Sequence, residues 1–507
     1  MSLDLARGWA LVLALLPETV LTVWAMALLL DAAWHHQRPD AQRRAGLLAL
    51  IGIVLAAAAA LWLWLSGAHA VGSPASVAVD AFRWAVDLIV LLAAALAVIF
   101  SVDYLDREGI LIPEFHVLVL FAAVGMMLMA GGSDLFVGFL GLELMSVSVY
   151  VLSGIDRRSR VGGEAALKYF LLGAFASAFF LYGIALLYGA TGSTKIPVIA
   201  ARLAPLGLAG HPMLTGGMAL LFIGFAFKIA AVPFHMWTPD VYDGAPTTVT
   251  AYMAAAVKAA AFAALVRVLL QGFGSIHPNW EQVIWWLAAV TMLVGNLIAL
   301  AQRTLKRMLA YSSIAHAGYL LTALVAGSVA GAAAFLFYLL FYTLMTVGAF
   351  AILSFKGRHG ERDVLIDDLA GLAEPHPWLA FALTICMLSL LGFPGTAGFI
   401  GKWYILVSAT GGGYPILAAV LVVTSVVSAG YYLPVVMAMY MKPPAHDQAH
   451  ASVQVPRAAA VALAVMVVAL LVFGLWPNLV LEAAKDGSHA FQPHGLISVG
   501  APVTAGN

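Results

Sequence analysis

Long apolar runs, separated by short polar segments, make up most of the chain. A helix needs about 20 apolar residues to cross about 30 Å of hydrocarbon, so each run predicts a membrane-spanning helix. The runs lie at residues 9–31, 46–66, 78–101, 113–130, 133–153, 165–189, 214–232, 247–270, 281–301, 306–326, 330–354, 377–409, 414–441 and 457–477. The pattern predicts an all-α polytopic membrane protein with about fourteen transmembrane helices. The first run lacks a convincing cleavage site and is expected to be a retained helix.

Composition agrees with a membrane protein. Of the 507 residues, 63% are hydrophobic and 10% charged, whereas soluble domains carry about 25% charged residues. A net charge of zero argues against a nucleic-acid partner. Neither a Cys/His cluster nor a glycine-rich nucleotide loop accompanies the single cysteine, Cys386, so we expect no metal, iron–sulfur, nucleotide or flavin site in this chain. The polar residues after Trp476 predict a surface tail.

The basic residues predict an orientation, because cytoplasmic loops are enriched in lysine and arginine. Fifteen fall in alternate loops, namely Arg38, Arg43, Arg44, Arg107, Arg157, Arg158, Arg160, Arg303, Lys306, Arg307, Lys356, Arg358, Arg362, Lys442 and Arg457. Five fall on the opposite side, namely Arg7, Lys195, Arg202, Arg267 and Lys485. Both termini are therefore expected outside.

Five further basic residues fall inside predicted helices, namely Arg83, Lys168, Lys228, Lys258 and Lys402. A lysine at the bilayer centre costs about 2.5–3.5 kcal/mol on insertion scales, so such residues usually face a hydrated interior and mark a transport path. Arg83 has a structural explanation, because Asp80 and Asp87 lie three and four residues away on the same helix face. The four lysines show no such same-helix partner, which favours conduction.

Prolines and glycines interrupt two helices close to these lysines. Helices 7 and 8 are separated by Pro233, Pro239 and Pro246, and proline breaks a helix. Helix 12, LSLLGFPGTAGFIGKWYILV, has glycines around Lys402. Interrupted helices in corresponding places are typical of inverted-repeat transporters. We expect two inverted five-helix repeats (helices 4–8 and 9–13) with broken helices 7 and 12, and divisions at 1–112, 113–271, 279–442 and 443–507.

Glu143 is an acid inside an apolar run, and its expected partners are Lys168 and Lys228. Burial disfavours the charged form of a lysine and a nearby carboxylate favours it. Moving a carboxylate could therefore switch a lysine between holding and releasing a proton. The alternative is a static buried ion pair that only fixes helix packing.

Histidines leave two interpretations open. His316 could relay a proton between Lys258 and Lys402, because histidine titrates near neutrality, or it could be a hydrogen-bonded packing residue. His235 could mark a proton entrance or shape the helix break. Similar roles, or helix capping, are open for Asp240 and Asp243. Interfacial positions are expected for the remaining candidates, His35, His36 and His116.

The segment KIAAVPFHMWTPDVYDGAPTTVTAYMAAAVK resembles broken helix 7 and helix 8 of the antiporter-like subunits of respiratory complex I and of Mrp-type cation/proton antiporters. LLPETVLTVWAMALLL, DYLDREG and FVGFLGLELMSVSVYVLSGIDRRSRVGGEAALKYF resemble the branch of that family called subunit N, the counterpart of mitochondrial subunit 2. Lys402 on helix 12 supports this branch. The resemblance covers nearly all 507 residues, and a fourteen-helix form is similar to bacterial members.

This resemblance implies a proton-translocating membrane-arm subunit of a bacterial NADH:quinone oxidoreductase, placed in the inner membrane with periplasmic termini. Glu143 would be paired with Lys168 or Lys228. Lys228 would hold the proton of the cytoplasmic half-channel, Lys258 would connect it, and Lys402 would release it. No cofactor is implied in this chain; FMN, iron–sulfur clusters and quinone would belong to other subunits of the complex. The implied partners are those membrane-arm subunits, lipid and protons, with quinone only indirect.

The residues and the resemblance together suggest a hypothesis for the cycle. Glu143 stabilises protonated Lys228, and when Glu143 is drawn towards Lys168 the proton moves through Lys258, with or without His316, to Lys402. Two rivals remain. One is a subunit of a Mrp antiporter or membrane-bound hydrogenase with the same lysines. The other is a passive structural subunit, in which those lysines tolerate neutral replacement.

Overall fold

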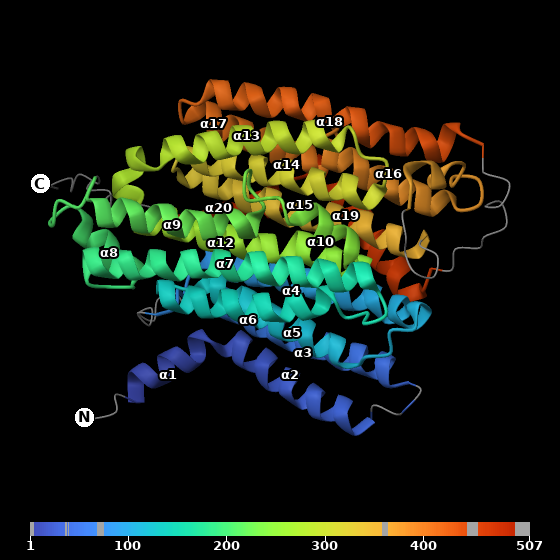
Figure 1. Ribbon diagram of the computed structural model, residues 1–507, viewed down its shortest axis with the longest axis horizontal. Helices are drawn as coiled ribbons and strands as arrows, with labels where there is room; N and C mark the ends of the chain where they lie inside the picture. Colours follow the sequence, from blue (N-terminus) through green and yellow to red (C-terminus); the bar gives the residue numbers. More distant parts are fainter. Residues whose placement is uncertain are drawn as a thin grey trace, which may run out of the picture.

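The computed structural model describes residues 5–35, 38, 40–67, 76–356, 364–443 and 455–491, and these segments are helical with no β-strand. Most helices lie side by side along the long axis of the molecule, while α1 and α2 form a V at its N-terminal edge (Figure 1). The first half contains α1 Leu5–Ala14, α2 Leu16–His35, α3 Ala41–Leu65, α4 Ala81–Glu108, α5 Glu114–Gly131, α6 Leu135–Ser153, α7 Arg160–Thr191, α8 Ile196–Leu203, α9 Pro212–Ile229, α10 Thr238–Gly244, α11 Thr247–Tyr252 and α12 Lys258–Arg267.

The second half continues the bundle. It contains α13 Glu281–Ala299, α14 Leu305–Val325, α15 Val329–Lys356, α16 Pro377–Leu391, α17 Ala397–Gly411, α18 Pro415–Met441, α19 Arg457–Leu475 and α20 Asn478–Ser488. The π-helical segment Met253–Val257 joins α11 to α12, and a second one, Val268–Gly272, extends α12, so that all four form one span. Short 3-10 helices are Gly274–Asn279, Ile366–Leu369 and His489–Phe491.

Thirteen helices of the described segments are long and apolar enough to cross a membrane, which confirms the polytopic all-α class. The predicted span 377–409 instead consists of α16 and α17, each of 15 residues. The total of fourteen spans and the inverted repeats therefore stay predictions.

Both predicted helix breaks are present. α9 ends with Ala230 in the left-handed conformation (φ 60°), and residues 231–237 then run as turns before α10. α16 ends in the same way at Gly392 (φ 85°), before α17 begins at Ala397. A left-handed residue stops the helix, and the amides that follow it satisfy only some of the last carbonyls, here those of Ala226, Phe227, Leu388 and Ser389. Each break therefore supplies free backbone acceptors next to a lysine-bearing helix.

Several sequence expectations about helix ends were wrong. The first span is split into α1 and α2 at Leu15, just before Pro17, whose ring cannot continue a helix. The region after Trp476 begins with α20, which packs against α4 and α15 instead of forming a surface tail, while residues 492–507 lie outside the described segments. Arg267 is buried in α12 and Lys306 in α14, so neither is a loop residue.

Other expectations about polar residues fall in two groups. His116 is buried in the first turn of α5, with its Nε2 3.1 Å from Gln42 Nε2, and its interfacial position stays a prediction. Arg358, Arg362 and His36 lie outside the described residues, as does the side chain of Arg7, so the predicted orientation remains a prediction.

Two glycines let α5 and α6 pack backbone against backbone. A Cβ atom added at Gly125 would lie 2.4 Å from Met145 N, and one added at Gly141 would lie 2.5 Å from Met129 N. Small residues at such crossings let membrane helices approach closely. The position of α6, which carries Glu143 and Tyr150, depends on this contact.

We expect Gly125→Ala or Gly141→Ala to destabilise the protein by about 1–3 kcal/mol, the usual cost of overpacking. Gly163→Ala in α7 is the matched control, because a Cβ atom there meets nothing within 4 Å and alanine favours a helix by about 1 kcal/mol over glycine. Thermal unfolding of the purified chain in detergent measures all three. Equal melting temperatures for the three variants would contradict the close contact.

Candidate functional site

Lys228 lies near the end of α9 in a pocket made of aromatic side chains. Its side chain is 1% exposed, and Nζ donates a hydrogen bond to Tyr150 Oη at 3.1 Å. The ammonium lies 5.0 Å from the ring centroid of Tyr150 and 5.2 Å from that of Tyr169. Trp237, after the break, stacks on Tyr169 at 4.3 Å and donates to Phe227 O, so the broken segment closes the pocket. Aromatic faces stabilise a cation without a counter-charge.

Glu143 pairs with neither predicted lysine. It is half-buried on α6, two helical turns before Tyr150, and its Oε1 is buried without a hydrogen-bond partner. Lys168 lies 2.7 Å from Glu164 Oε1 and 3.0 Å from Asp240 Oδ2. The expected Glu143 pairing is therefore absent from this conformation. Lys168 also has the same-helix partner that we had missed, Glu164, at the i−4 position.

A surface network joins α7, α10 and α14. Asp240 accepts from Lys168 and, at 3.1 Å, from Arg307, which also lies 3.5 Å from Asp243. Burial raises the pKa of the Asp240 carboxyl, but its hydrogen bonds with Lys168 and Arg307 lower it more, so the net shift is below the usual range. Lys306 next to Arg307 donates to Ala245 O at 2.7 Å. The start of α14 is thus fixed to the end of α10, which the sequence did not predict.

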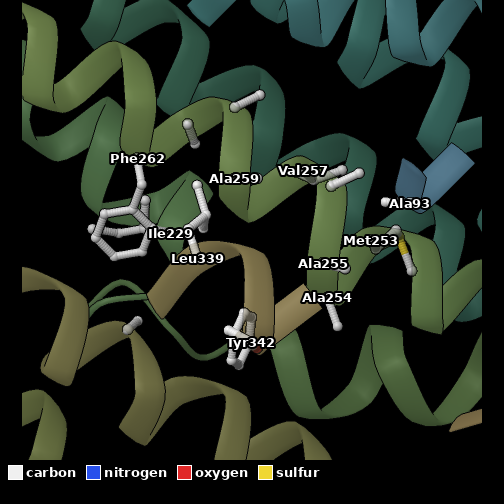
Figure 2. Packing of buried hydrophobic residues seen from close by; sticks show 14 of the residues in the cluster. Ala93, Ile229, Met253, Ala254, Ala255, Val257, Ala259, Phe262, Leu339 and Tyr342 are labelled. Carbon is white, nitrogen blue, oxygen red and sulfur yellow. The ribbon is translucent and has the colours of Figure 1, made fainter. Parts of the chain in front are cut away.

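Lys258 is the first residue of α12, directly after the π-helical segment. It is 1% exposed, and Nζ donates to the carbonyl and hydroxyl oxygens of Ser313 on α14. Ser313 Oγ lies 2.8 Å from Tyr342 Oη on α15. Figure 2 shows this region, where small side chains of the π-helix and α12 pack near Leu339 and Tyr342, with Ala254, Ala255 and Ala259 labelled. π-Helical turns are common at functional sites because they reorient side chains.

His316 lies between Lys258 and Lys402 in a group of hydroxyls, as the relay interpretation requires. Its Nδ1 is 2.6 Å from Tyr338 Oη, and its Nε2 is 3.1 Å from Tyr432 Oη. Tyr432 Oη is also hydrogen-bonded to Ser312 Oγ, next to the Ser313 that binds Lys258. The same contacts would suit a packing residue, so both interpretations remain open on geometry.

Lys402 on α17 occupies the second break. Its side chain is 6% exposed, and Nζ donates to Leu391 O at 3.0 Å and to Ser425 Oγ at 3.3 Å. The ammonium lies 4.4 Å from the ring centroid of Tyr319, which neighbours His316 on α14. The carbonyl freed where α16 ends is thus one of its acceptors.

Among the described residues, His235 makes no hydrogen bond to any of these lysines. It lies half-buried in the segment between α9 and α10, and its Nδ1 is buried without a hydrogen-bond partner. Burial lowers the pKa of the His235 imidazole, partly offset by a hydrogen bond at Pro233. Its part in the entrance or the break remains a prediction.

Lys228, Lys258 and Lys402 share one property. Within the described segments, no acidic side chain lies within 4.0 Å of their Nζ atoms, which instead contact serine, tyrosine and backbone oxygens. Sequence reasoning found the lysines but missed the tyrosines, because nothing local marks which aromatic residues face inward. The described residues also contain no group of His, Cys, Asp or Glu suited to a metal.

Comparisons with known proteins agree with the fold. The family described as NADH:quinone oxidoreductase/Mrp antiporter, TM, matches residues 132–428. NADH-quinone oxidoreductase subunit N from Gemmatimonas aurantiaca is 48% identical over 504 residues, covering 97% of this chain and 96% of that protein. Subunit N from Trichlorobacter lovleyi is 47% identical over 472 residues, covering 93% of this chain and 96% of that protein.

Solved structures give the same result. A chain of respiratory complex I from Thermus thermophilus matches with a TM-score of 0.79 and 40% identity, covering 93% of this chain and 100% of that chain. A chain of the Mrp complex from Dietzia sp. has a TM-score of 0.80 but 23% identity, covering 94% and 97%, so this likeness shows the fold alone. The identities over almost the full length confirm the resemblance found in the motifs, and the chain belongs to the subunit N family of the NADH-quinone oxidoreductases.

Proposed function

We propose that this chain translocates protons across the bacterial inner membrane as a membrane-arm subunit of NADH:quinone oxidoreductase. The observation that carries the proposal is the row of three buried lysines without acidic partners. A charged lysine in hydrocarbon costs about 2.5–3.5 kcal/mol on insertion scales, so a chain that keeps three of them has a use for their protons. Family membership supplies the redox partner.

The path we propose starts at the cytoplasmic side, at Lys228 in its aromatic pocket. The proton then passes through water to Lys258. From there it moves along the hydroxyls of α14 and α18 and the imidazole of His316. It leaves through Lys402 towards the periplasm. Glu143 acts on Lys228 by moving towards it. Its buried Oε1 has no hydrogen-bond partner among the described residues, so no hydrogen bond holds that oxygen in its present position. His235 lies at the entrance.

The energy scale permits this cycle. Moving one charge against about 180 mV costs about 4 kcal/mol, at about 2.3 kcal/mol per 100 mV. The same energy corresponds to about a thousandfold change in the proton affinity of one group. Approach or withdrawal of one carboxylate near a buried lysine can change its proton affinity by that amount.

Other features of the proposal follow from the family. FMN, iron–sulfur clusters and quinone would act in other subunits of the complex, so this chain would be part of the enzyme without holding its redox centre. Neighbouring membrane-arm subunits and lipid would cover its exposed apolar helices. Both termini would be periplasmic, and helices 4–8 and 9–13 would be inverted repeats, consistent with the left-handed residues that end both α9 and α16.

The two alternative functions predict different relatives and different roles for the lysines. A Mrp-type or hydrogenase subunit would share the fold, but the relatives at 47–48% identity over most of the chain are named subunit N of NADH-quinone oxidoreductase. A passive structural subunit has no need of unpaired lysines, and apolar residues in their places would stabilise it. The lysines therefore provide the test.

We expect Lys228→Met and Glu143→Gln to lower NADH:quinone turnover and coupled proton uptake by about tenfold or more, since proton-transfer groups contribute about 10²–10⁴-fold. Both are measured together on the intact complex in sealed vesicles, with assembly checked on native gels. Lys485→Ala is the control, because Lys485 is exposed on α20 and outside the lysine row. Unchanged turnover and stoichiometry in an assembled Lys228→Met complex would establish the passive subunit instead.

Tyr150→Phe tests the pocket more finely. It keeps the ring under the Lys228 ammonium but removes the hydroxyl that accepts its hydrogen bond. A hydrogen bond to a charged group contributes about 1.5–3 kcal/mol, so we expect about a tenfold loss of coupled proton uptake. The same change at exposed Tyr182 on α7 is the control. A Tyr150→Phe complex that pumps like wild type would mean that Lys228 does not depend on this hydroxyl.

His316→Gln separates relay from packing. Glutamine can keep hydrogen bonds to the tyrosine hydroxyls but cannot exchange a proton near neutral pH. If His316 relays, we expect normal assembly with proton uptake reduced by about tenfold or more, as for other proton-transfer groups. Normal uptake in an assembled complex would identify His316 as a packing residue.

A further inference from the structure

A second group of charged side chains lies where the N-terminal helices α2 and α4 meet α12, and all but one of its members precede the residues matched by the family description. It has three acids and two bases, contributed by α2, the start of α4 and α12, namely Glu18, Asp80, Arg83, Asp87 and Arg267. All but Asp80 are 3% exposed or less. The sequence suggested that Asp80 and Asp87 neutralise Arg83.

The expected ion pair of Arg83 with Asp87 is present at 3.5 Å, but the hydrogen-bonded pairs of the cluster are different. Arg83 Nη2 donates to Glu18 Oε1 on α2 at 2.5 Å. Arg267 holds both oxygens of Asp80, at 2.7 and 3.0 Å. Asp80 therefore caps α4 and neutralises Arg267 instead of Arg83. Each guanidinium has one carboxylate of its own, and each pair is charge-neutral.

Asp87 is left over. Its side chain is 0% exposed, and neither carboxyl oxygen has a hydrogen-bond partner among the described residues. Arg83 Nε lies 3.5 Å from Oδ2 without making a hydrogen bond, and that Nε is itself unpartnered. With all five groups ionised, the cluster would carry one net negative charge. A buried carboxylate that accepts no hydrogen bond and shares its nearest cation with a second acid is costly to keep ionised, and such groups take up a proton instead.

We propose that Asp87 is a proton-binding site, holding one proton inside the N-terminal helices apart from the lysine row. The other charged groups of the cluster, within the described residues, are Glu18 from α2, Arg83 and the N-cap residue Asp80 from its own helix, and Arg267 from α12. Asp80 is seven residues away, about 10 Å along the helix axis, and its side chain is 20% exposed. Through this residue the cluster reaches the solvent-exposed surface at the start of α4.

The first test is infrared spectroscopy of the full chain in lipid nanodiscs. A protonated carboxyl gives a C=O stretch apart from the carboxylate bands. Among the described residues, Asp87 is the aspartate that is fully buried. We expect a band that moves on ¹³C labelling of the aspartate side chains, is absent in Asp87→Asn, and survives in Asp80→Asn. Labelling needs no variant, so the test holds if a variant does not fold.

Three infrared results would contradict the proposal. A wild-type chain with no aspartate C=O band from pH 6 to 8 overturns the proposal, as does a carboxylate band at Asp87 that responds to added Na⁺, which would indicate a bound cation. A band that moves on glutamate labelling alone would assign the proton to Glu18 and also overturns it.

Thermal stability gives a second, independent test. Asn has the shape of protonated Asp and no charge, so Asp87→Asn should leave the melting temperature of the chain as in wild type. Asp80→Asn breaks an ionised pair with Arg267 and should lower it clearly. If Asp87 were an ionised partner of Arg83, Asp87→Asn would lower the melting temperature as much as Asp80→Asn, which would contradict the proposal.

Discussion

The constraint on which this structure depends is the cost of placing a charge in hydrocarbon. Lys228, Lys258 and Lys402 are buried within the bundle, and none has a carboxylate within 4.0 Å among the described residues. Their ammonium groups are stabilised instead by hydroxyls, carbonyls and aromatic faces. Such partners compensate only part of the lost hydration. Under the mechanism proposed above, this incomplete compensation is what lets a neighbouring carboxylate decide whether a lysine keeps its proton.

The helix breaks are subject to the same constraint, because their backbone groups must also find polar partners. A broken helix survives at membrane depth only if its freed backbone groups find partners. After α9, Val232 N donates to Thr291 Oγ1 and the indole of Trp237 donates to Phe227 O. After α16, the carbonyl of Leu391 accepts from Lys402. In an intact helix these carbonyls accept hydrogen bonds from the helix itself. At the breaks they accept hydrogen bonds from Trp237 and Lys402.

Sequence reasoning reached the fold class and the lysines because both depend on local signals. Apolar runs predict spans, and a lysine or proline inside one is conspicuous. Glu164 four residues before Lys168 was an equally local signal and was missed. Tyr150, Tyr338 and Tyr432 could not be predicted, since inward-facing and outward-facing tyrosines look alike in an apolar helix. Nor could Glu18 be predicted as the partner of Arg83, which lies 65 residues away in the chain.

Buried cations in this chain fall into two chemical classes. Arg83 and Arg267 each face a carboxylate at hydrogen-bond distance, whereas the three lysines face neutral groups. A guanidinium keeps its proton under all physiological conditions, while a buried ammonium can lose it. Residue type and partner together therefore separate two kinds of buried cation, namely arginines paired with carboxylates and lysines surrounded by hydroxyls, carbonyls and aromatic rings. Under the mechanism proposed above, it is this absence of a carboxylate that leaves the lysine protons exchangeable.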